Sequence, residues 1–256
     1  MNAIAVSGLN LSLGGLPILK DISFTIDEGL TVALLGANGS GKSTLVRALL
    51  GLIRRQQGTV ALLGQPIERF TAWDQIGYVP QRAAVSLHST TVAEVVGSGT
   101  LAKRPLGWFG AAQRERVHQA LSAVGLADSA KELYLHLSGG QQQRVLIARG
   151  IVNQPRLIIM DEPFAGVDLA NQAEITDVLA GFSATTLVVL HEIEAMAGLI
   201  DRTLVLREGR LVYDGPLMES APPSAHQTHT SDHHTLDHHT PNHPQLLTEL
   251  ETQWTS

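Results

Sequence analysis

The chain has 256 residues, a formal net charge of -6 and no cysteine, and 44% of its residues are hydrophobic. Its length fits one domain with an inserted lobe, because single domains usually contain about 100–200 residues. No apolar run approaches the length that crosses a bilayer, about 20 residues, and the first residues lack the basic start and apolar stretch of a secretory signal. The absence of cysteine excludes disulfides and thiolate metal sites, and the absence of a basic run argues against nucleic acid as a partner.

The first part of the chain predicts two paired strands, then a third strand and a helix. Residues 3–13 and 18–26 alternate apolar and polar side chains around a Gly-Gly-Leu-Pro turn, as an antiparallel hairpin does. Residues 30–36 form a short apolar run that ends at glycine, and a helical pattern begins at Lys42. This order of strand, Gly-rich turn and helix indicates the start of a βα unit.

The second half of the chain predicts a parallel sheet. Residues 157–160 and 185–190 are compact, β-rich apolar runs, and a helical pattern around residues 169–181 separates them. A helical crossover of this kind places its two strands in parallel in one sheet. About residues 84–154 contain helical patterns and no clear strand. They predict a helical lobe inserted into an α/β core.

The composition changes after Pro216. Residues 217–245 are rich in His, Pro and Thr and contain too few apolar side chains to build a core, so we expect a disordered tail there. Residues 246–256 could form a short helix, although isolated helices of that length are marginal. We therefore expect residues 1–216 to form the folded domain.

Residues 36–43 match the phosphate-binding pattern G-x-x-x-x-G-K-[ST], and they lie between a predicted strand and a predicted helix, as that pattern requires. Glycines let backbone N–H groups turn toward a phosphate, and the helix start adds the positive end of a dipole. We expect Lys42 to contact the β- and γ-phosphates of ATP and Ser43 to offer its hydroxyl to Mg²⁺. A Gly-rich turn with an exposed lysine is the simpler alternative, which the strand and helix around it disfavour. The residues predicted to bind the nucleotide here are Gly36, Asn38, Gly39, Ser40, Gly41, Lys42, Ser43 and Thr44.

Two acidic residues, Asp161 and Glu162, follow the buried strand pattern of residues 157–160. Open α/β sheets bind their ligands at the carboxyl ends of the strands, where these two carboxylates lie. We expect Asp161 to hold Mg²⁺ and Glu162 to act as the general base that polarises the attacking water. Without the phosphate-binding pattern, two solvated acids would be the better interpretation.

A third element, Leu137-Ser138-Gly139-Gly140-Gln141, precedes another helical pattern. With these three motifs in this order, the chain resembles the ABC ATPase family over about residues 3–215, because this pentapeptide is the family's signature. The resemblance implies an α/β fold: a P-loop NTPase (RecA-like) core with a small antiparallel β-subdomain and an inserted helical subdomain. A serine and two glycines at a helix start form an anion-binding nest. In the family this nest completes a nucleotide site only when two subunits meet head to tail, and here its residues are Ser138, Gly139, Gly140 and Gln141.

Three smaller matches follow the family's order. Gln81 corresponds to the glutamine that joins the core to the helical lobe and senses Mg²⁺ and the γ-phosphate. Asp168 falls in the family's subunit-contact loop, and His191 matches the histidine that steadies the γ-phosphate. One position departs from the pattern, because the family usually stacks an aromatic residue on adenine where this chain has Leu13. Leu13 offers apolar contact without π-stacking, so what recognises the base is left open.

A single nucleotide-binding domain without a membrane span resembles the separate ATPase subunit of a bacterial importer. Residues 161–168, DEPFAGVD, are similar to the ATPases of zinc, manganese and iron importers. The resemblance implies a homodimer, an integral-membrane permease, an extracytoplasmic metal-binding receptor and a place on the cytoplasmic face of the plasma membrane. The competing class is a soluble ABC ATPase without a permease, whose members usually carry tandem ATPase domains or long coiled-coil insertions that this sequence lacks.

The tail adds separate chemistry. Seven of the chain's 11 histidines fall between residues 226 and 243, interleaved with two aspartates. Imidazole and carboxylate groups suit Zn²⁺ and, less selectively, other borderline divalent ions. A polar linker whose histidines bind nothing is the alternative, and a purification tag is disfavoured because the histidines are spaced. The candidate zinc ligands are His233, His234, His238 and His239.

Overall fold

The computed structural model describes residues 1–81, 89–102 and 110–217, in which Met1–Pro216 form one compact unit. The candidate zinc ligands lie outside the described residues. Across the described ranges, each helix is either too short or too polar to cross a membrane.

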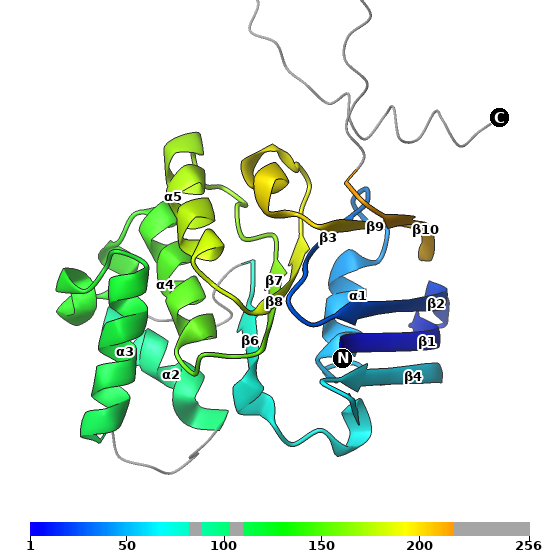
Figure 1. Cartoon of the computed structure of the whole chain (residues 1–256), viewed down its shortest axis with the longest axis horizontal. Helices are drawn as coiled ribbons and strands as arrows, with labels where there is room; N and C mark the ends of the chain where they lie inside the picture. The colour runs from blue at the N-terminus through cyan, green and yellow to red at the C-terminus, as the bar shows by residue number, and fades with distance from the viewer. Residues whose placement is uncertain (82–88, 103–109, 218–256) are drawn as a thin grey trace, which may run out of the picture. The chain divides into compact units, whose positions relative to one another are not determined.

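A four-stranded antiparallel sheet contains the first two strands of the chain and has the order β2-β1-β4-β5. Figure 1 labels β2, β1 and β4 of this sheet. The predicted hairpin forms its first half, and Gly14 and Gly15 take φ values of 57° and 83° in the turn, which glycine adopts without steric cost. The other two strands were not predicted from the sequence. The strands are β1 (Asn2–Leu13), β2 (Leu16–Asp27), β4 (Gln57–Leu62) and β5 (Gln65–Pro66).

A six-stranded sheet forms the centre of the unit, in the order β10-β9-β3-β8-β7-β6. Strands β9, β3, β8, β7 and β6 are parallel, and only β10 pairs antiparallel with its neighbour. The predicted α/β fold class is therefore confirmed. The strands are β3 (Thr31–Leu35), β6 (Ile76–Val79), β7 (Leu157–Asp161), β8 (Thr185–Val189), β9 (Arg202–Arg207) and β10 (Arg210–Gly215).

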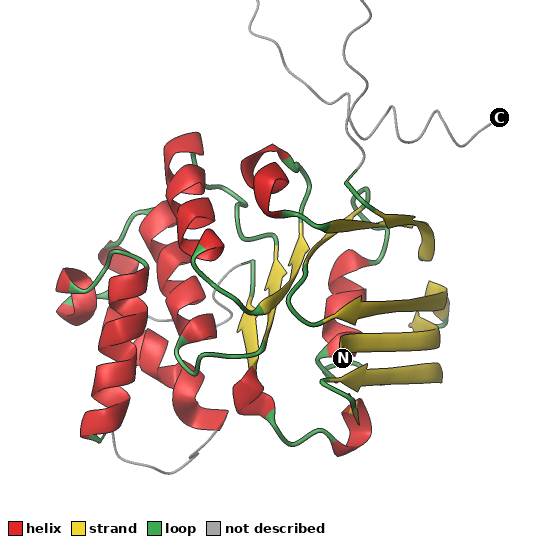
Figure 2. Ribbon diagram, viewed as in Figure 1, coloured by secondary structure: helices red, strands yellow, loops and turns green. Residues whose placement is uncertain are grey.

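Helices cover this sheet and gather mainly on one side of it (Figure 2). The α-helices are α1 (Lys42–Leu49), α2 (Val92–Ser98), α3 (Ala111–Ala123), α4 (Gly139–Ile151) and α5 (Leu169–Ala180). Short 3-10 helices are η1 (Ile67–Arg69), η2 (Trp73–Gln75), η3 (Gly99–Ala102), η4 (Asp128–Lys131), η5 (Tyr134–His136) and η6 (Glu194–Leu199). Helices α1 and α5 begin where the sequence patterns predicted them.

Two apolar cores lie on opposite faces of the six-stranded sheet, because successive side chains of a strand point to opposite faces. On β3, Leu34 packs with α1 and the antiparallel sheet, whereas Leu35 packs with α4. Helix α1 thus lies between the two sheets, and α4 lies on the other face (Figure 1). A backbone hydrogen bond from Lys20 N to Gly209 O, 2.8 Å, joins β2 to the turn before β10 and so links the two sheets.

The described residues between 84 and 154 contain α2, α3 and α4, with one isolated bridge between Thr91 and Leu133. Capping boxes start α2 at Thr91 and α4 at Ser138, where each side chain accepts from a backbone N–H three residues on. Apolar side chains of the three helices form one buried cluster with the sheet. This cluster fixes the start of α4, which carries the signature pentapeptide.

Candidate active site

Four neighbouring strands end at one edge of the six-stranded sheet, and each one delivers a residue that the sequence singled out. Gly36 follows β3, His191 comes two residues after β8, Asp161 ends β7, and Gln81 comes two residues after β6. The four strands are parallel, so their carboxyl ends meet at this edge. The edge is the usual position of a ligand site in an open α/β sheet.

The loop from Gly36 to Gly41 has a backbone that only glycine adopts easily. Gly36, Gly39 and Gly41 have φ values of 147°, 81° and 107°. A Cβ added at Gly36 would lie 2.2 Å from the carbonyl oxygen of Leu206, so a side chain cannot fit there. The loop then enters α1 at Lys42, and the first N–H groups of that helix have no intrahelical acceptor. This backbone suits a phosphate, which accepts such N–H groups.

The side chain of Lys42 is buried, with 5% of its surface exposed. Its Nζ donates to the carbonyl oxygens of Gly36, at 2.6 Å, and Ala37, at 3.2 Å. Burial lowers the pKa of Lys42, and the nearby carboxylates of Glu162 and Asp161 oppose that shift. A buried cation at the phosphate loop fits a polyphosphate, whose charge would offset the loss of hydration.

Asp161 and Ser43 place two oxygen atoms side by side, of the kind that bind Mg²⁺. The Ser43 hydroxyl donates to Oδ1 of Asp161 at 3.3 Å, and Asp161 is 7% exposed. Burial raises the pKa of Asp161, and the hydrogen bond from Ser43 opposes the shift. Hydroxyl and carboxylate oxygens are the hard ligands that Mg²⁺ prefers, and a cation here would favour the ionised form.

Glu162 lies between Gln81 and His191. Gln81 donates its Nε2–H to Oε2 of Glu162 at 2.5 Å, and Nε2 of His191 lies 2.7 Å from Oε1. Glu162 has a φ of 52°, which is costly for a residue with a side chain and is found most often at functional sites. Its amide donates to the carbonyl oxygen of Val189, which fixes the strained residue against β8. The structure thus brings Gln81, Glu162 and His191 together.

The signature residues lie elsewhere in the same chain. Ser138 caps α4 through N–H of Gln141, and the Gln141 side chain accepts from N–H of Ser138 at 2.9 Å. Ser138 and Gly139 are exposed. Among the described residues no hydrogen bond joins this helix start to the phosphate loop, and α1 and α4 pack on opposite faces of the sheet.

Asp168 caps the start of α5. Its side chain accepts from the backbone N–H of Asn171 at 3.1 Å and from the side-chain Nδ2 of Asn171 at 2.6 Å. These hydrogen bonds lower the pKa of Asp168. Asn171 is not among the residues predicted from the sequence, although a polar residue three positions after an N-cap aspartate is a recognisable signal of side-chain contact at a helix start.

Leu13, the departure from the family pattern, ends β1 beside the Gly-Gly turn. Its side chain is 41% exposed, and that of its strand partner Leu16 is 68% exposed. Both are therefore available to an apolar ligand surface, and neither offers a ring for stacking.

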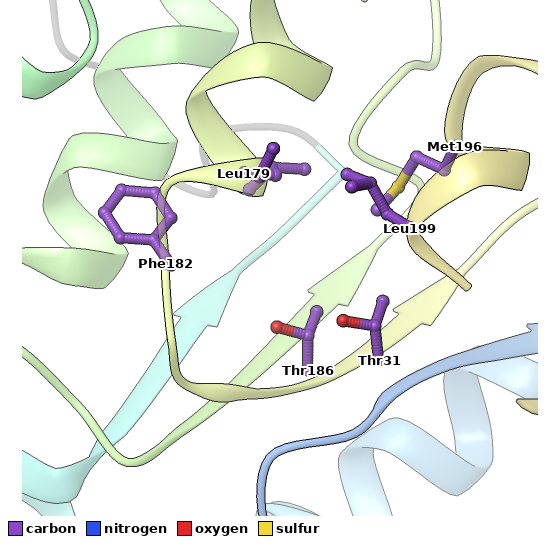
Figure 3. A pocket seen from close by; sticks show the side chains of 7 residues that line it. Thr31, Leu179, Phe182, Thr186, Met196 and Leu199 are labelled. Atoms are coloured by element: carbon purple, nitrogen blue, oxygen red, sulfur yellow. The ribbon is translucent and has the colours of Figure 1, made fainter. Parts of the chain in front are cut away.

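A small cavity lies at the amino ends of β3 and β8, opposite the strand ends that carry the phosphate loop and Glu162. Figure 3 shows Thr31 and Thr186 side by side at the starts of β3 and β8, facing Met196 and Leu199. Its volume is about 80 Å³, far below the roughly 300–1,000 Å³ of sites for drug-sized ligands. Because it lies at the amino ends of the strands, the cavity is separate from the candidate active site.

Comparisons with known proteins agree with these motifs. The family described as "ABC transporter" matches residues 19–165, more than half of the chain. The zinc transport system ATP-binding protein TroB of Treponema pallidum is 37% identical over 225 residues, which cover 85% of this chain and 83% of that protein. The manganese transport system ATP-binding protein MntB of Bacillus subtilis is 38% identical over 209 residues, with 78% and 81% covered.

Other relatives widen the range of cargo. ATP-binding proteins for the import of iron(III), phosphonates and cobalt are 35%, 38% and 37% identical to this chain. Among solved structures, cbiO1 of Clostridium perfringens, part of the transporter complex cbiONQ, has a TM-score of 0.74 and 30% identity, with 84% of this chain and 88% of that chain covered. The chain belongs to the ABC transporter family as an ATP-binding subunit of the kind that hydrolyses ATP.

Proposed function

We propose that two copies of the chain meet head to tail, hydrolyse MgATP at sites shared between them, and thereby energise a permease that imports a divalent metal ion, zinc or manganese. The proposal of ATP hydrolysis rests on one cluster of residues at the carboxyl ends of the strands of one sheet. The cluster contains Lys42, Asp161, Glu162, His191 and Gln81. ATP and Mg²⁺ are the substrate and metal of the family.

Each residue of the cluster has one role in this proposal. The glycine loop and Lys42 hold the phosphates, and Ser43, Asp161 and Gln81 hold Mg²⁺, which neutralises phosphate charge. Glu162 takes a proton from the attacking water, because its carboxylate is held at the end of β7 by two neighbours. His191 leaves Glu162 to steady the γ-phosphate when the nucleotide is bound.

The second copy supplies the other side of the site. Ser138, Gly139, Gly140 and Gln141 form a helix start that can accept an anion, with Ser138 and Gly139 exposed, and they are not hydrogen-bonded to the phosphate loop of their own chain. In this head-to-tail dimer, Asp168 also lies at the contact between the two subunits. Leu169, beside it, is 82% exposed in the single chain and would be covered in this arrangement.

The cargo and the location rest on the relatives. We place the dimer on the cytoplasmic face of the plasma membrane against an integral-membrane permease, which receives metal from an extracytoplasmic receptor. The DEPFAGVD sequence of residues 161–168 and the zinc and manganese relatives support a metal cargo. In the tail, His233, His234, His238 and His239 bind Zn²⁺ or a similar ion and regulate the transporter.

Glu162→Gln tests the hydrolytic role. The variant keeps the shape of the side chain but replaces the carboxylate by a neutral amide that cannot act as a base, so we expect it to bind ATP, to hydrolyse it at least about a hundredfold more slowly, and to accumulate as a dimer by light scattering. Lys42→Ala is the matched contrast and should lose nucleotide binding itself. Near-normal turnover by Glu162→Gln would refute the assignment of the base.

Metal uptake tests the cargo. Cells that lack this chain should lose uptake of zinc or manganese, wild-type protein should restore it, and Glu162→Gln should not. If the protein restored phosphonate uptake instead, the cargo would be a phosphonate and not a metal ion. Failure to copurify with a membrane-spanning protein would favour the alternative of an ABC ATPase without a permease.

A further inference from the structure

Asn171, in the first turn of α5, makes contacts that no motif explains. It is partly buried, and it donates twice to one carboxylate: its backbone N–H to Oδ1 of Asp168 at 3.1 Å and its side-chain Nδ2 to Oδ2 at 2.6 Å. Both oxygens of Asp168 are thus held by a single residue. The Asp168 side chain is fixed in one orientation although the residue itself is exposed.

The other side of Asn171 contacts the signature helix. A Cβ added at Gly140 would lie 2.5 Å from Cγ, 2.6 Å from Oδ1 and 2.9 Å from Cβ of Asn171, so the absence of a side chain at Gly140 makes room for Asn171. An added Cβ at Gly139 would lie 3.9 Å from the carbonyl oxygen of Gly166, in the loop before Asp168. The glycines of the signature are therefore also the surface on which this loop and Asn171 pack.

A second link joins the same two helices one turn further on. Arg144 of α4 and Glu174 of α5 form an ion pair of 2.9 Å, and Arg144 also donates to the carbonyl oxygen of Val124 after α3. Figure 1 shows α4 and α5 side by side. Glu174 is 56% exposed, so the ion pair contributes little stability, and Asn171 is the stronger link.

We propose that Asn171 is a positioning residue, which fixes Asp168 relative to the signature serine so that both reach the opposite subunit together when two copies close on ATP. The inference rests on the head-to-tail dimer of the proposed function. Loss of the Asn171 side chain removes one donor to Asp168 and the packing on Gly140. It leaves the backbone cap of α5 in place, so the helix still begins at the same residue.

The test measures ATP-driven dimerisation in the Glu162→Gln background, where hydrolysis does not disperse the dimer. Asn171→Ala should lower the association constant of the dimer about tenfold, because each Asp168 side chain is then mobile in the monomer and must lose that freedom on assembly. The affinity of the monomer for a nucleotide analogue and the melting temperature should stay unchanged. Asn171→Ser, whose hydroxyl can still donate to Asp168, should recover most of the loss. Asp177→Ala, at an exposed position of the same helix, is the control and should have no effect.

A second measurement uses the hydrolytically active chain. If Asn171 acts on assembly, the activity lost in Asn171→Ala should return as the protein concentration is raised, and kcat at saturation should match the wild type. Dimerisation of Asn171→Ala equal to its parent would overturn the inference. So would a loss accompanied by lower monomer affinity and lower melting temperature, because it would mark a merely structural role. If the Glu162→Gln parent itself stays monomeric with MgATP while the wild type hydrolyses it, the head-to-tail dimer fails, and the inference fails with it.

Discussion

Lys42 and Asp161 are the two charged side chains that the described part of the chain buries. Burial shifts both pKa values toward the neutral form, downward for Lys42 and upward for Asp161. The ionised groups therefore cost stability in the folded chain, and a bound polyphosphate with Mg²⁺ would supply the missing opposite charges. Such a site lowers the stability of the nucleotide-free protein and raises its affinity for the ligand.

Asp161→Asn should therefore stabilise the nucleotide-free protein. The folded-state pKa of Asp161 is raised above the unfolded value, so the cost of its charge is fully present above the folded pKa and vanishes below the unfolded one. The melting temperature should rise by about 2–4 °C for each kcal/mol relieved, and the gain should shrink in acid. Calorimetry with a chelator present measures this.

Asp177→Asn, at an exposed position, is the control for Asp161→Asn and should melt like the wild type at every pH. Addition of MgATP should stabilise the wild type and Asp177→Asn more than Asp161→Asn, which has lost a metal ligand. A lower melting temperature for Asp161→Asn at neutral pH would show that Lys42 and Ser43 stabilise the carboxylate by more than burial costs it.

The sequence revealed the residues of the site whose chemistry depends on local spacing. Lys42, Ser43, Asp161 and Glu162 lie directly at strand ends or helix starts, so their positions follow from the neighbouring patterns. The contact of Asn171 with Gly140 could not be found in this way, because it depends on how α4 and α5 pack. The orientation of Glu162 between two neighbours likewise depends on the order of β6, β7 and β8 in the sheet.

At the scale of elements, α4 packs on its neighbours through backbone atoms. A Cβ added at Gly77 of β6 would lie 2.5 Å from the carbonyl oxygen of Gly150, and one added at Gly99 would lie 2.3 Å from that of Arg149. Neither glycine has a positive φ, so close approach explains both. These contacts set how near the signature helix lies to the strand that precedes Gln81.

Gly77→Ala should therefore force α4 away from β6 and destabilise the protein by about 1–3 kcal/mol, the usual cost of overpacking. The clash is with backbone and cannot be relieved by a side-chain rotation. Urea unfolding measures the change. Gly198→Ala in η6 is the matched control, because an added Cβ there meets nothing within 4 Å, and its stability should stay the same or rise slightly. Equal stability of the two variants would contradict the close packing.

Elements were predictable where a single stretch carried the signal. The β1–β2 hairpin, β3, β7, β8 and α5 follow from alternation, apolar runs or helical periodicity within about a dozen residues. Strands β4, β5, β6, β9 and β10 were missed. Strand β4 gains its place by pairing with β1 far away in the sequence, and β6 has only four residues. The β9–β10 hairpin could have been found, because Glu208 and Gly209 form its turn.

At the scale of the whole molecule, strand order determines which residues meet. Strand β8 lies between β3 and β7, so His191 comes between the phosphate loop and the acidic pair. Nothing in the periodicity of single strands contains this order, which arises from the crossovers that pack on each face. The compact unit ends at Pro216, and the histidines of the tail follow it in sequence.

Truncation after Pro216 should leave ATP hydrolysis intact and remove any response to Zn²⁺. The residues of the active site all lie before this point, whereas seven histidines lie after it. Calorimetry of the full chain should detect zinc binding of modest affinity, because a tail whose composition predicts disorder loses conformational entropy when it closes around the metal. Ligation needs neutral imidazoles, so binding should weaken as the pH falls below about 6.5, and metal uptake should release protons.

Replacement of His233, His234, His238 and His239 by alanine in the full chain separates ligation from tail length, and this variant should behave like the truncated one. Identical zinc binding by the full and truncated chains would refute a metal site in the tail, and the metal cargo would then rest on residues 161–168 and the relatives alone.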